Sequence, residues 1–517
     1  MSSLREKVGR MLLVGFEGLH PPDYILEWLA EGRIGGVIFF ARNVESPAQV
    51  ARLVRSVQSA ARHPPLIAID QEGGIVARLR EGFTESPGAM ALGAADSEML
   101  AEQVAAALGA ELHALGINFN LAPVVDIGHD SSNPVISTRT LGAEAARVSR
   151  LAVAQVRGFQ SAGVAACAKH FPGHGNTPTD SHVSLPVVSG ALDFLWEHDL
   201  VPFRATVDAD IASVMISHVK FEALDPVYPS TLSPAIITGL LREEIGFEGL
   251  IVTDCMEMQA ITQNYGAGES AVLAALAGVD AMFFSHTRQN QEAAYDALLQ
   301  AAESGRLPLA QIDAANARLD AFTRHFPAVE PGDLSAIRRA DHLRVCQAAA
   351  EAGTVLLTAN LDVFPLHPQR QRVAVIEFAS HLETGVLDQS GLTGLGALLH
   401  AQAPGIVHIA LNPADPQPAA LEEARRMARA AEVTIVATRS AHLLPRQREI
   451  AQEMLSIASR GALLCLRNPY DVEVLAGADA ILCTCGDSAP SLQAAVDALL
   501  GRFTPAGRLP VPLRRAV

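Results

Sequence analysis

Eight short apolar runs, separated by stretches with helical periodicity, constrain the fold of the first 325 residues more than any other feature of the sequence. Most of the runs are rich in β-branched or aliphatic residues and follow a Gly, Pro or Asp turn signal. The runs are residues 11–16, 34–40, 65–70, 117–122, 164–169, 211–217, 249–253 and 280–284. Eight strand–helix units predict an α/β fold of the (β/α)8 barrel type, a TIM-like barrel with its chemistry at the carboxyl ends of the strands. An open doubly wound sheet is the alternative that the same alternation permits.

A second α/β pattern follows a segment without apolar periodicity. Residues 326–340 mix Pro, Gly and charges, which is typical of a linker. Beyond them, five strand-like runs alternate with Ala-rich helical stretches, as in a three-layer α/β/α sandwich. These runs are residues 372–378, 406–411, 433–438, 462–466 and 480–485. We therefore expect a barrel over 1–325, a linker over 326–340 and a sandwich over 341–517.

Net charge limits the kinds of molecule that this chain can bind, and cysteine content indicates its cellular compartment. Lys and Arg number 39 against 56 Asp and Glu, a net charge of -17, and this balance disfavours nucleic acid and anionic membranes. No run of 18 apolar residues predicts a membrane span. Six sparse cysteines, mostly within apolar runs, are typical of free thiols in a reducing compartment, so we expect a cytoplasmic protein. The sequence indicates no cofactor and leaves the oligomeric state open.

The densest polar cluster begins where the fifth predicted strand ends. Lys169, His170, His174, Asp180 and His182 lie within fourteen residues, among glycines that permit sharp turns. Lysine is rare in this chain, occurring only three times, and a compact ammonium suits hydrogen bonds to sugar hydroxyls. Each histidine alone would be interpreted as a loop cap, but the cluster as a whole indicates a functional site. A zinc site is the competing hypothesis, although the spacings match no usual ligand motif.

Asp180 and His182 are separated by one residue, so they share a face in an extended segment. A carboxylate beside an imidazole fixes its tautomer and raises its pKa, which makes His182 a workable proton donor near neutral pH. The pair is therefore a candidate for acid/base catalysis.

Three further signals also follow predicted strand ends, the active face of a barrel. Asp254 comes just after the seventh run, where a carboxylate can attack an anomeric carbon; a helix N-cap is its alternative role. Asp70 begins the segment DQEGG, with Arg78 shortly after, and can accept hydrogen bonds from two sugar hydroxyls. Arg139 ends the segment NPVISTR and is a candidate ligand for hydroxyl or carbonyl oxygens.

Together these segments resemble the bacterial β-N-acetylglucosaminidases of glycoside hydrolase family 3. The resemblance covers the whole first domain and rests mainly on KHFPGHGNTPTDSH (169–182) and VTDCMEM (252–258), while LLGRFTPAGRLPVPL (499–513) is similar to the family's C-terminal sandwich. It implies Asp254 as nucleophile, His182 as acid/base and Asp180 as its partner. The positions that it implies for binding the terminal sugar are Asp70, Arg78, Arg139, Lys169 and His170. Ile75 and Asn176 depart from the family's common Arg and Asp, which affects loop packing or aglycone binding rather than a proposed catalytic group.

The resemblance implies an exo-acting retaining glycosidase that acts on a small carbohydrate, with cell-wall (peptidoglycan) fragments or chitooligosaccharides as expected substrates. Several rivals stay open: a β-glucosidase, a phosphorylase in which phosphate replaces water, a metal-dependent hydrolase, and a sugar-binding protein without activity. For the second domain, shielding of the barrel is one hypothesis.

Overall fold

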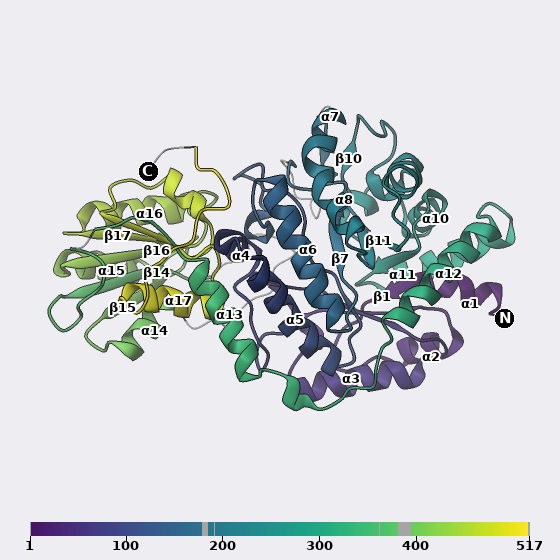
Figure 1. Ribbon diagram of the computed structural model, residues 1–517, viewed down its shortest axis with the longest axis horizontal. Coiled ribbons are helices and arrows are strands. Elements are labelled where there is room, and N and C mark those ends of the chain that lie inside the picture. Colours follow the sequence, from purple (N-terminus) through teal and green to yellow (C-terminus); the bar gives the residue numbers. More distant parts are fainter. Residues whose placement is uncertain (1, 178–184, 191, 361, 381–393, 515–517) are drawn as a thin grey trace.

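The computed structural model describes residues 2–177, 185–190, 192–360, 362–380 and 394–514. They form two lobes, and the first half of the chain lies entirely in the larger lobe (Figure 1). The larger lobe contains eight parallel strands, each apolar enough to be buried on both sides. The strands are β1 (Leu12–Val14), β2 (Gly36–Phe39), β3 (Leu66–Ile69), β6 (Phe119–Asn120), β7 (Cys167–Phe171), β9 (Ser213–Ile216), β11 (Leu250–Cys255) and β12 (Ala281–Phe284).

These strands close into a barrel. Their order is β6-β3-β2-β1-β12-β11-β9-β7, and the two outer strands also meet each other. The amide of Asn120 donates to the carbonyl of Ala165 at 2.9 Å, and a second parallel bridge joins Val124 to Lys169. The prediction of a (β/α)8 barrel is therefore confirmed, and the alternative of an open sheet is wrong.

Helices surround the barrel, and their ends carry the expected signals. Ser46 and Ser97 cap two of them through hydrogen bonds to backbone amides, and Gly278 ends a third in the left-handed conformation, with φ 105°. The main helices of the ring are α2 (Asp23–Glu31), α3 (Pro47–Ala60), α5 (Glu98–Ala114), α6 (Ala145–Ser161), α8 (Leu200–Asp208), a π-helix (Ala235–Glu244), α10 (Ala267–Ala277) and α11 (Arg288–Glu303).

The interior of the barrel is filled at one end and hollow at the other. Helix α12 (Leu309–His325) places Phe322 against Phe119 inside the barrel, with ring centroids 5.0 Å apart. Toward the opposite end, Leu121 and Met215 from the same apolar cluster line a cavity instead. The packing thus leaves space only where the carboxyl ends of the strands meet.

The smaller lobe is a three-layer sandwich, as predicted. Its sheet has the order β13-β18-β17-β16-β14-β15, with five parallel strands and an antiparallel edge strand, β13, that the sequence analysis missed. The strands are β13 (Val355–Thr358), β14 (Val373–Phe378), β15 (Val407–Leu411), β16 (Val433–Thr438), β17 (Gly461–Cys465) and β18 (Ala480–Cys483). Helices α14 (Leu395–Gln402) and α17 (Ala489–Leu499) pack on one face, and α15 (Pro418–Ala430) and α16 (Pro445–Ile457) on the other.

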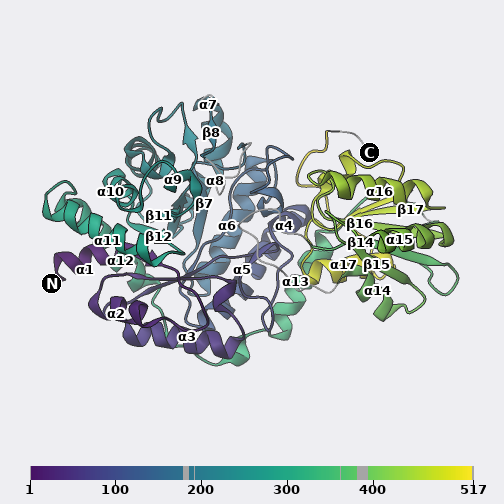
Figure 2. The same ribbon diagram turned by 180° about the vertical axis from the view of Figure 1, so that it is seen from behind.

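The two lobes share a packed interface. Helix α13 (Ala340–Ala352) lies between them in both ribbon views (Figures 1 and 2). Met90 and Ala91 of α4 (Ala89–Ala95), a helix of the larger lobe, belong to the hydrophobic core of the sandwich. Gly353 is required here, because a Cβ would lie 2.3 Å from the carbonyl oxygen of Ala91. The lobes are therefore joined by a continuous core rather than tethered by a linker alone.

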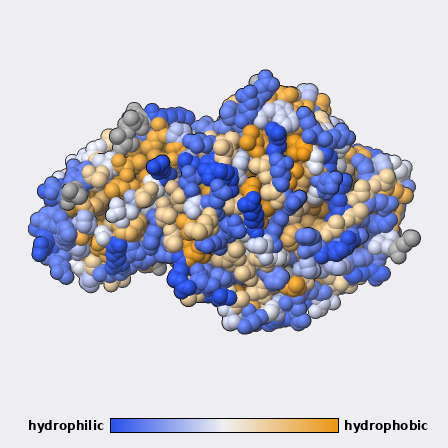
Figure 3. Space-filling model, viewed as in Figure 1, coloured by the Kyte–Doolittle hydropathy of each residue, from blue (hydrophilic) through white to orange (hydrophobic). Residues whose placement is uncertain are grey.

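On the face shown in Figure 3, apolar groups are interrupted by hydrophilic ones over both lobes. Within the described part of the chain, every helix is too short or too polar to cross a membrane.

Candidate active site

The carboxyl ends of the barrel strands meet around a cavity of about 310 Å³. All the described residues that the sequence analysis proposed as catalytic or sugar-binding border this cavity, although they come from four separate segments of the chain. They are Asp70, Arg78, Arg139, Lys169, His170 and Asp254. The expectation that the strand ends bring these segments together is therefore correct.

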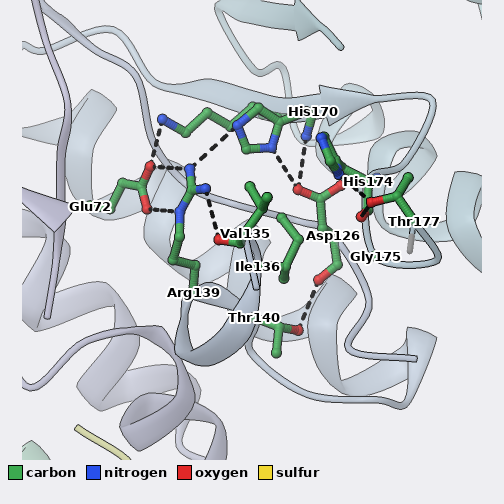
Figure 4. A network of polar contacts seen from close by, with 12 residues as sticks. Glu72, Asp126, Val135, Ile136, Arg139, Thr140, His170, His174, Gly175 and Thr177 are labelled. Atoms are coloured by element: carbon green, nitrogen blue, oxygen red, sulfur yellow. Dashed lines mark hydrogen bonds and ion pairs between the residues drawn. The ribbon is translucent and has the colours of Figure 1, made fainter. Parts of the chain in front are cut away.

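One wall of the cavity is a buried network of fixed charges (Figure 4). The ammonium nitrogen of Lys169, which is 2% exposed, lies 2.6 Å from a carboxylate oxygen of Asp70 and 2.6 Å from one of Glu72. Arg139 binds the same Glu72 carboxylate through two hydrogen bonds of 2.9 and 2.8 Å. Such charge-assisted, two-point contacts hold the guanidinium in one orientation.

The cations keep both acids of this wall ionised. Burial alone would raise the pKa of Glu72, but Arg139 and Lys169 outweigh it and hold that pKa at about 2. Burial opposes the charge of Asp70 in the same way, and Lys169 and Arg78 lower its pKa below the usual value. At neutral pH the wall therefore presents carboxylate oxygens and cationic N–H groups, which are the partners that sugar hydroxyls need.

The loop after β3 is shaped by its own side chains. Gln71 is buried, and its amide oxygen accepts hydrogen bonds from the backbone of Arg78 and Leu79, at 2.9 and 3.0 Å. Gly74 has φ 60°, and a Cβ there would lie 2.8 Å from Gly88. This close approach folds the loop back and brings the guanidinium of Arg78 to 3.3 Å from Asp70.

His170 is oriented by Asp126, a residue that the sequence analysis missed. One carboxylate oxygen of Asp126 accepts from the backbone amide of His170 at 3.1 Å and contacts its Nδ1 at 2.7 Å. The other ring nitrogen, Nε2, lies 3.4 Å from Arg139, which can only donate. This arrangement fits the tautomer with hydrogen on Nδ1.

His174 lies deeper and links the two loops of this wall. Its Nδ1 is 2.7 Å from the hydroxyl of Thr177, and its backbone carbonyl accepts from Asn133 at 2.9 Å. Burial, with the nearby His170 ring, lowers the pKa of His174 to about 4. The ring is therefore neutral at physiological pH.

Asp254 lies on β11 itself, at the edge of the same cavity. The next helix, α9 (Gln259–Thr262), begins five residues later with Met258 as its N-cap, so the alternative role of Asp254 as a helix N-cap is wrong. Its Oδ1 accepts from the amide of Cys255 at 2.6 Å. The carbonyl of Cys255 is in turn 2.8 Å from Nε2 of His218, a buried ring that joins the ends of β9 and β11.

The rest of the cavity is mostly apolar. Ile38, Leu121, Met215 and Phe283 form its floor, and Phe40 stands beside His286, with ring centroids 5.6 Å apart. A site with hydrogen-bonding charges on one wall and apolar groups elsewhere matches the two kinds of surface that a sugar presents.

The Asp180 and His182 pair falls outside the described residues. Its proposed role therefore rests on the sequence alone.

Glu72 and Asp126 are the main residues that the sequence analysis did not select. Glu72 stands inside the DQEGG segment that was singled out for Asp70. Asp126 follows the fourth strand, so the rule that chemistry collects after strand ends would have found it. Asp126 stands apart from any polar cluster in the sequence.

Comparisons with known proteins agree with the two-lobed fold. The model of the glycosyl hydrolase family 3 N-terminal domain matches residues 3–321. The chain is 34% identical over 431 residues to β-hexosaminidase A of Pseudoalteromonas piscicida, covering 76% of this chain and 72% of the relative. It is 38% identical over 290 residues to a β-hexosaminidase of Stenotrophomonas maltophilia, covering 55% of this chain and 85% of the relative. Among solved structures, a glycoside hydrolase family 3 β-N-acetylglucosaminidase from Paenibacillus sp. str. FPU-7 superposes with a TM-score of 0.94 at 36% identity, covering 99% of each chain.

Proposed function

Because the chain belongs to glycosyl hydrolase family 3, we propose that it is a retaining, exo-acting β-N-acetylglucosaminidase that removes terminal β-linked N-acetylglucosamine. The observation that carries this proposal is the cavity in which Asp254 and the wall of Asp70, Lys169 and Arg139 border the same space. Such a cavity of about 310 Å³ suits one sugar ring. The relatives named above are β-hexosaminidases and a β-N-acetylglucosaminidase, which supports the same sugar.

In this proposal Asp254 is the nucleophile. Its carboxylate attacks the anomeric carbon while His182, with Asp180 as its partner, protonates the departing glycosidic oxygen. Water activated by the same histidine then breaks the covalent glycosyl–enzyme bond. Two inversions retain the β configuration.

The charged wall has the task of holding the sugar. Asp70 accepts hydrogen bonds from hydroxyl groups, and Arg78, Arg139 and Lys169 offer donors to its oxygen atoms. Nε2 of His170, the ring nitrogen that does not face Asp126, is an acceptor for a sugar hydroxyl. Since Lys169 and Arg139 are already fixed by Asp70 and Glu72, little side-chain freedom is lost when the sugar binds.

The first test compares nitrophenol release from aryl β-N-acetylglucosaminide and aryl β-glucoside, with the wild type beside Asp254→Asn. We expect a strong preference for the acetamido sugar, and a loss of about three orders of magnitude or more in kcat for the variant. Preference for the glucoside would instead identify a β-glucosidase, and activity that survives Asp254→Asn would contradict the assigned nucleophile.

Phosphate in place of water as the second nucleophile is an alternative, because a neutral imidazole repels an incoming anion less than a carboxylate does. Turnover in inorganic phosphate separates the two reactions. Sugar 1-phosphate among the products would establish phosphorolysis, and free sugar alone would establish hydrolysis.

As natural substrates we propose cell-wall (peptidoglycan) fragments or chitooligosaccharides in the cytoplasm. The cytoplasmic location is supported by the six cysteines, all of which are free thiols. Cell fractionation tests the location, and release of N-acetylglucosamine from each class of fragment tests the substrate. We also propose the domain boundaries given above, with the barrel over 1–325 and the sandwich over 341–517.

A further inference from the structure

One loop of the barrel lies between the sugar site and the sandwich. This segment, residues 128–143, follows the fourth strand and leads into α6, and we call it the 128–143 loop. On the barrel side, Asn133 donates to the carbonyl of His174 at 2.9 Å, and Arg139 binds Glu72. Both contacts belong to the charged wall of the cavity, so a shift of this loop would move groups that face the sugar.

On its other side, the same loop is held by the sandwich. The hydroxyl of Ser137 donates to the side-chain oxygen of Asn468 at 3.2 Å. Asn468 is fully buried, and its amide nitrogen donates to Ser440 at 3.1 Å. At the end of the loop, the amide of Ala143 donates to the carbonyl of Pro510 at 2.9 Å.

The backbone of Ser137 shows that the loop is held in place by its surroundings. Its φ is 43°, in the left-handed region that residues with a Cβ adopt at a cost of about 1 kcal/mol or more. Such a conformation persists where neighbouring groups determine it. The hydrogen bond to Asn468 is the side-chain contact that does so at this residue.

Ser137 is rigidly connected to Arg139. The two residues begin and end one 3-10 turn, in which the amide of Arg139 donates to the carbonyl of Ile136 at 2.7 Å. The guanidinium also donates to the carbonyl of Val135 at 3.2 Å. A displacement of Ser137 is therefore transmitted to the guanidinium within a single turn.

We propose that the sandwich positions the sugar-binding wall of the barrel, with Asn468 as a positioning residue that acts through Ser137 on Arg139. The role at the sugar rests on the proposed function. Asn468 is not among the described residues that line the cavity, so we expect its effect to be on binding rather than on the reacting atoms. The sandwich is then part of the site and more than a shield for the barrel.

The test is a double-mutant cycle with Ser137→Ala, Asn468→Ala and the double variant, assayed on aryl β-N-acetylglucosaminide. Loss of one neutral hydrogen bond corresponds to about a fivefold change, so we expect KM to rise about fivefold in each single variant, with kcat within about twofold. Because both substitutions break the same contact, the double variant should be no worse than either single variant.

Two control variants separate positioning from a general weakening of the sandwich. Asn468→Asp keeps an oxygen that accepts from Ser137, and it should restore KM toward the wild-type value. Ser440→Ala removes the partner on the sandwich side of Asn468 and leaves the Ser137 contact in place, so its KM should stay unchanged. Thermal unfolding of each variant checks that it is folded.

Hydrogen exchange without substrate gives a second readout that needs no activity. Amides of residues 133–140 should lose protection in Asn468→Ala and keep it in Ser440→Ala. Unchanged exchange and unchanged KM in folded Asn468→Ala, or effects that multiply in the double variant, would overturn the proposal. If the wild type turns over no aryl β-N-acetylglucosaminide, the proposed function fails, while exchange still decides whether the sandwich holds the loop.

Discussion

Each lobe buries an aspartate between two cations, and the aspartate of the barrel borders the cavity described above. Asp70 of the barrel lies between Lys169 and Arg78, at 2.6 and 3.3 Å. Asp487 of the sandwich lies between Arg439 and Arg467, at 3.1 and 2.8 Å. In both cases burial opposes ionisation, and the paired cations outweigh it and lower the pKa of the aspartate.

The two clusters differ in what surrounds them. The side chain of Asp70 is 14% exposed, toward the cavity, whereas that of Asp487 is 3% exposed. Arg439 also donates to the backbone carbonyl of Phe378, and Arg467 to the hydroxyl of Ser380 at 3.0 Å. The same ion pairing therefore joins buried groups within the sandwich, whereas in the barrel it faces the cavity in which we propose that the sugar binds. Exposure to the cavity, rather than charge, distinguishes the two clusters.

The largest expected effects come from making the same substitution in both lobes. Asp70→Asn should lower kcat/KM by about a hundredfold or more, because each hydrogen bond from a hydroxyl to a charged group contributes about 1.5–3 kcal/mol. Asp487→Asn should instead lower the free energy of unfolding by about 3 kcal/mol, since two buried guanidinium groups lose their counter-ion, and should leave kcat/KM of the folded enzyme unchanged. Urea unfolding and nitrophenol release measure the two quantities.

A larger loss of kcat/KM in Asp487→Asn than in Asp70→Asn would contradict the structural role that we assign to Asp487. It would mean that the sandwich cluster takes part in the reaction or in binding.

His174 makes the free energy of unfolding of the barrel depend on pH. Its pKa in the folded chain, about 4, is lower than the usual histidine value of 6.5, so protonation favours the unfolded chain. The stability associated with this group is complete above pH 6.5 and is lost as the pH falls from 6.5 to 4, by about 3 kcal/mol in total. We expect His174→Gln to remove this part of the acid sensitivity.

Urea unfolding of the wild type and His174→Gln, above pH 6.5 and near pH 4, measures the difference. The loss of stability across this range should be smaller in the variant. An equal loss in both proteins would show that the ring is not the group responsible.

The smallest effect is expected at the exposed rim of the lobe interface. Arg514 lies 3.3 Å from Asp130, but its side chain is 73% exposed, so solvent screens the pair. Arg514→Ala should change KM less than twofold and the unfolding temperature hardly at all, in contrast to Asn468→Ala. A KM effect as large as that of Asn468→Ala would show that the rim contact also holds the 128–143 loop.

The fold was largely predictable because most of its strands are buried on both sides. All eight barrel strands overlap the predicted apolar runs, since a parallel sheet covered by helices requires such runs, although β7 and β11 each extend two residues beyond theirs. Strand β13 was missed because it is an antiparallel edge strand with three of its four residues only partly buried. Strand β6 is shorter than its apolar run, ending at Asn120 shortly before Pro123, which has no amide hydrogen to donate to a neighbouring strand.

The site was predictable where its residues cluster in the sequence. Lys169 and His170 stand in one motif, and Asp254 directly follows an apolar run, so their place in the sequence was enough to predict that they belong to the site. Asp126 also follows a strand, but it belongs to no polar motif, and its importance comes from holding His170 and His174 through space. The hydrogen bond between Ser137 and Asn468 joins residues that are 331 positions apart, so no local sequence pattern predicts it.

The contact between Ala143 and Pro510 can form only late in the synthesis of the chain, because its two partners are far apart in the sequence. The barrel strands and the loop that carries Arg139 leave the ribosome well before residue 510 is added. At about 5–20 residues per second, the interval between the two partners is some tens of seconds. During that time the nascent barrel has its strands but lacks the contact of the 128–143 loop with Pro510, so we expect full affinity for the sugar only after the sandwich has been added.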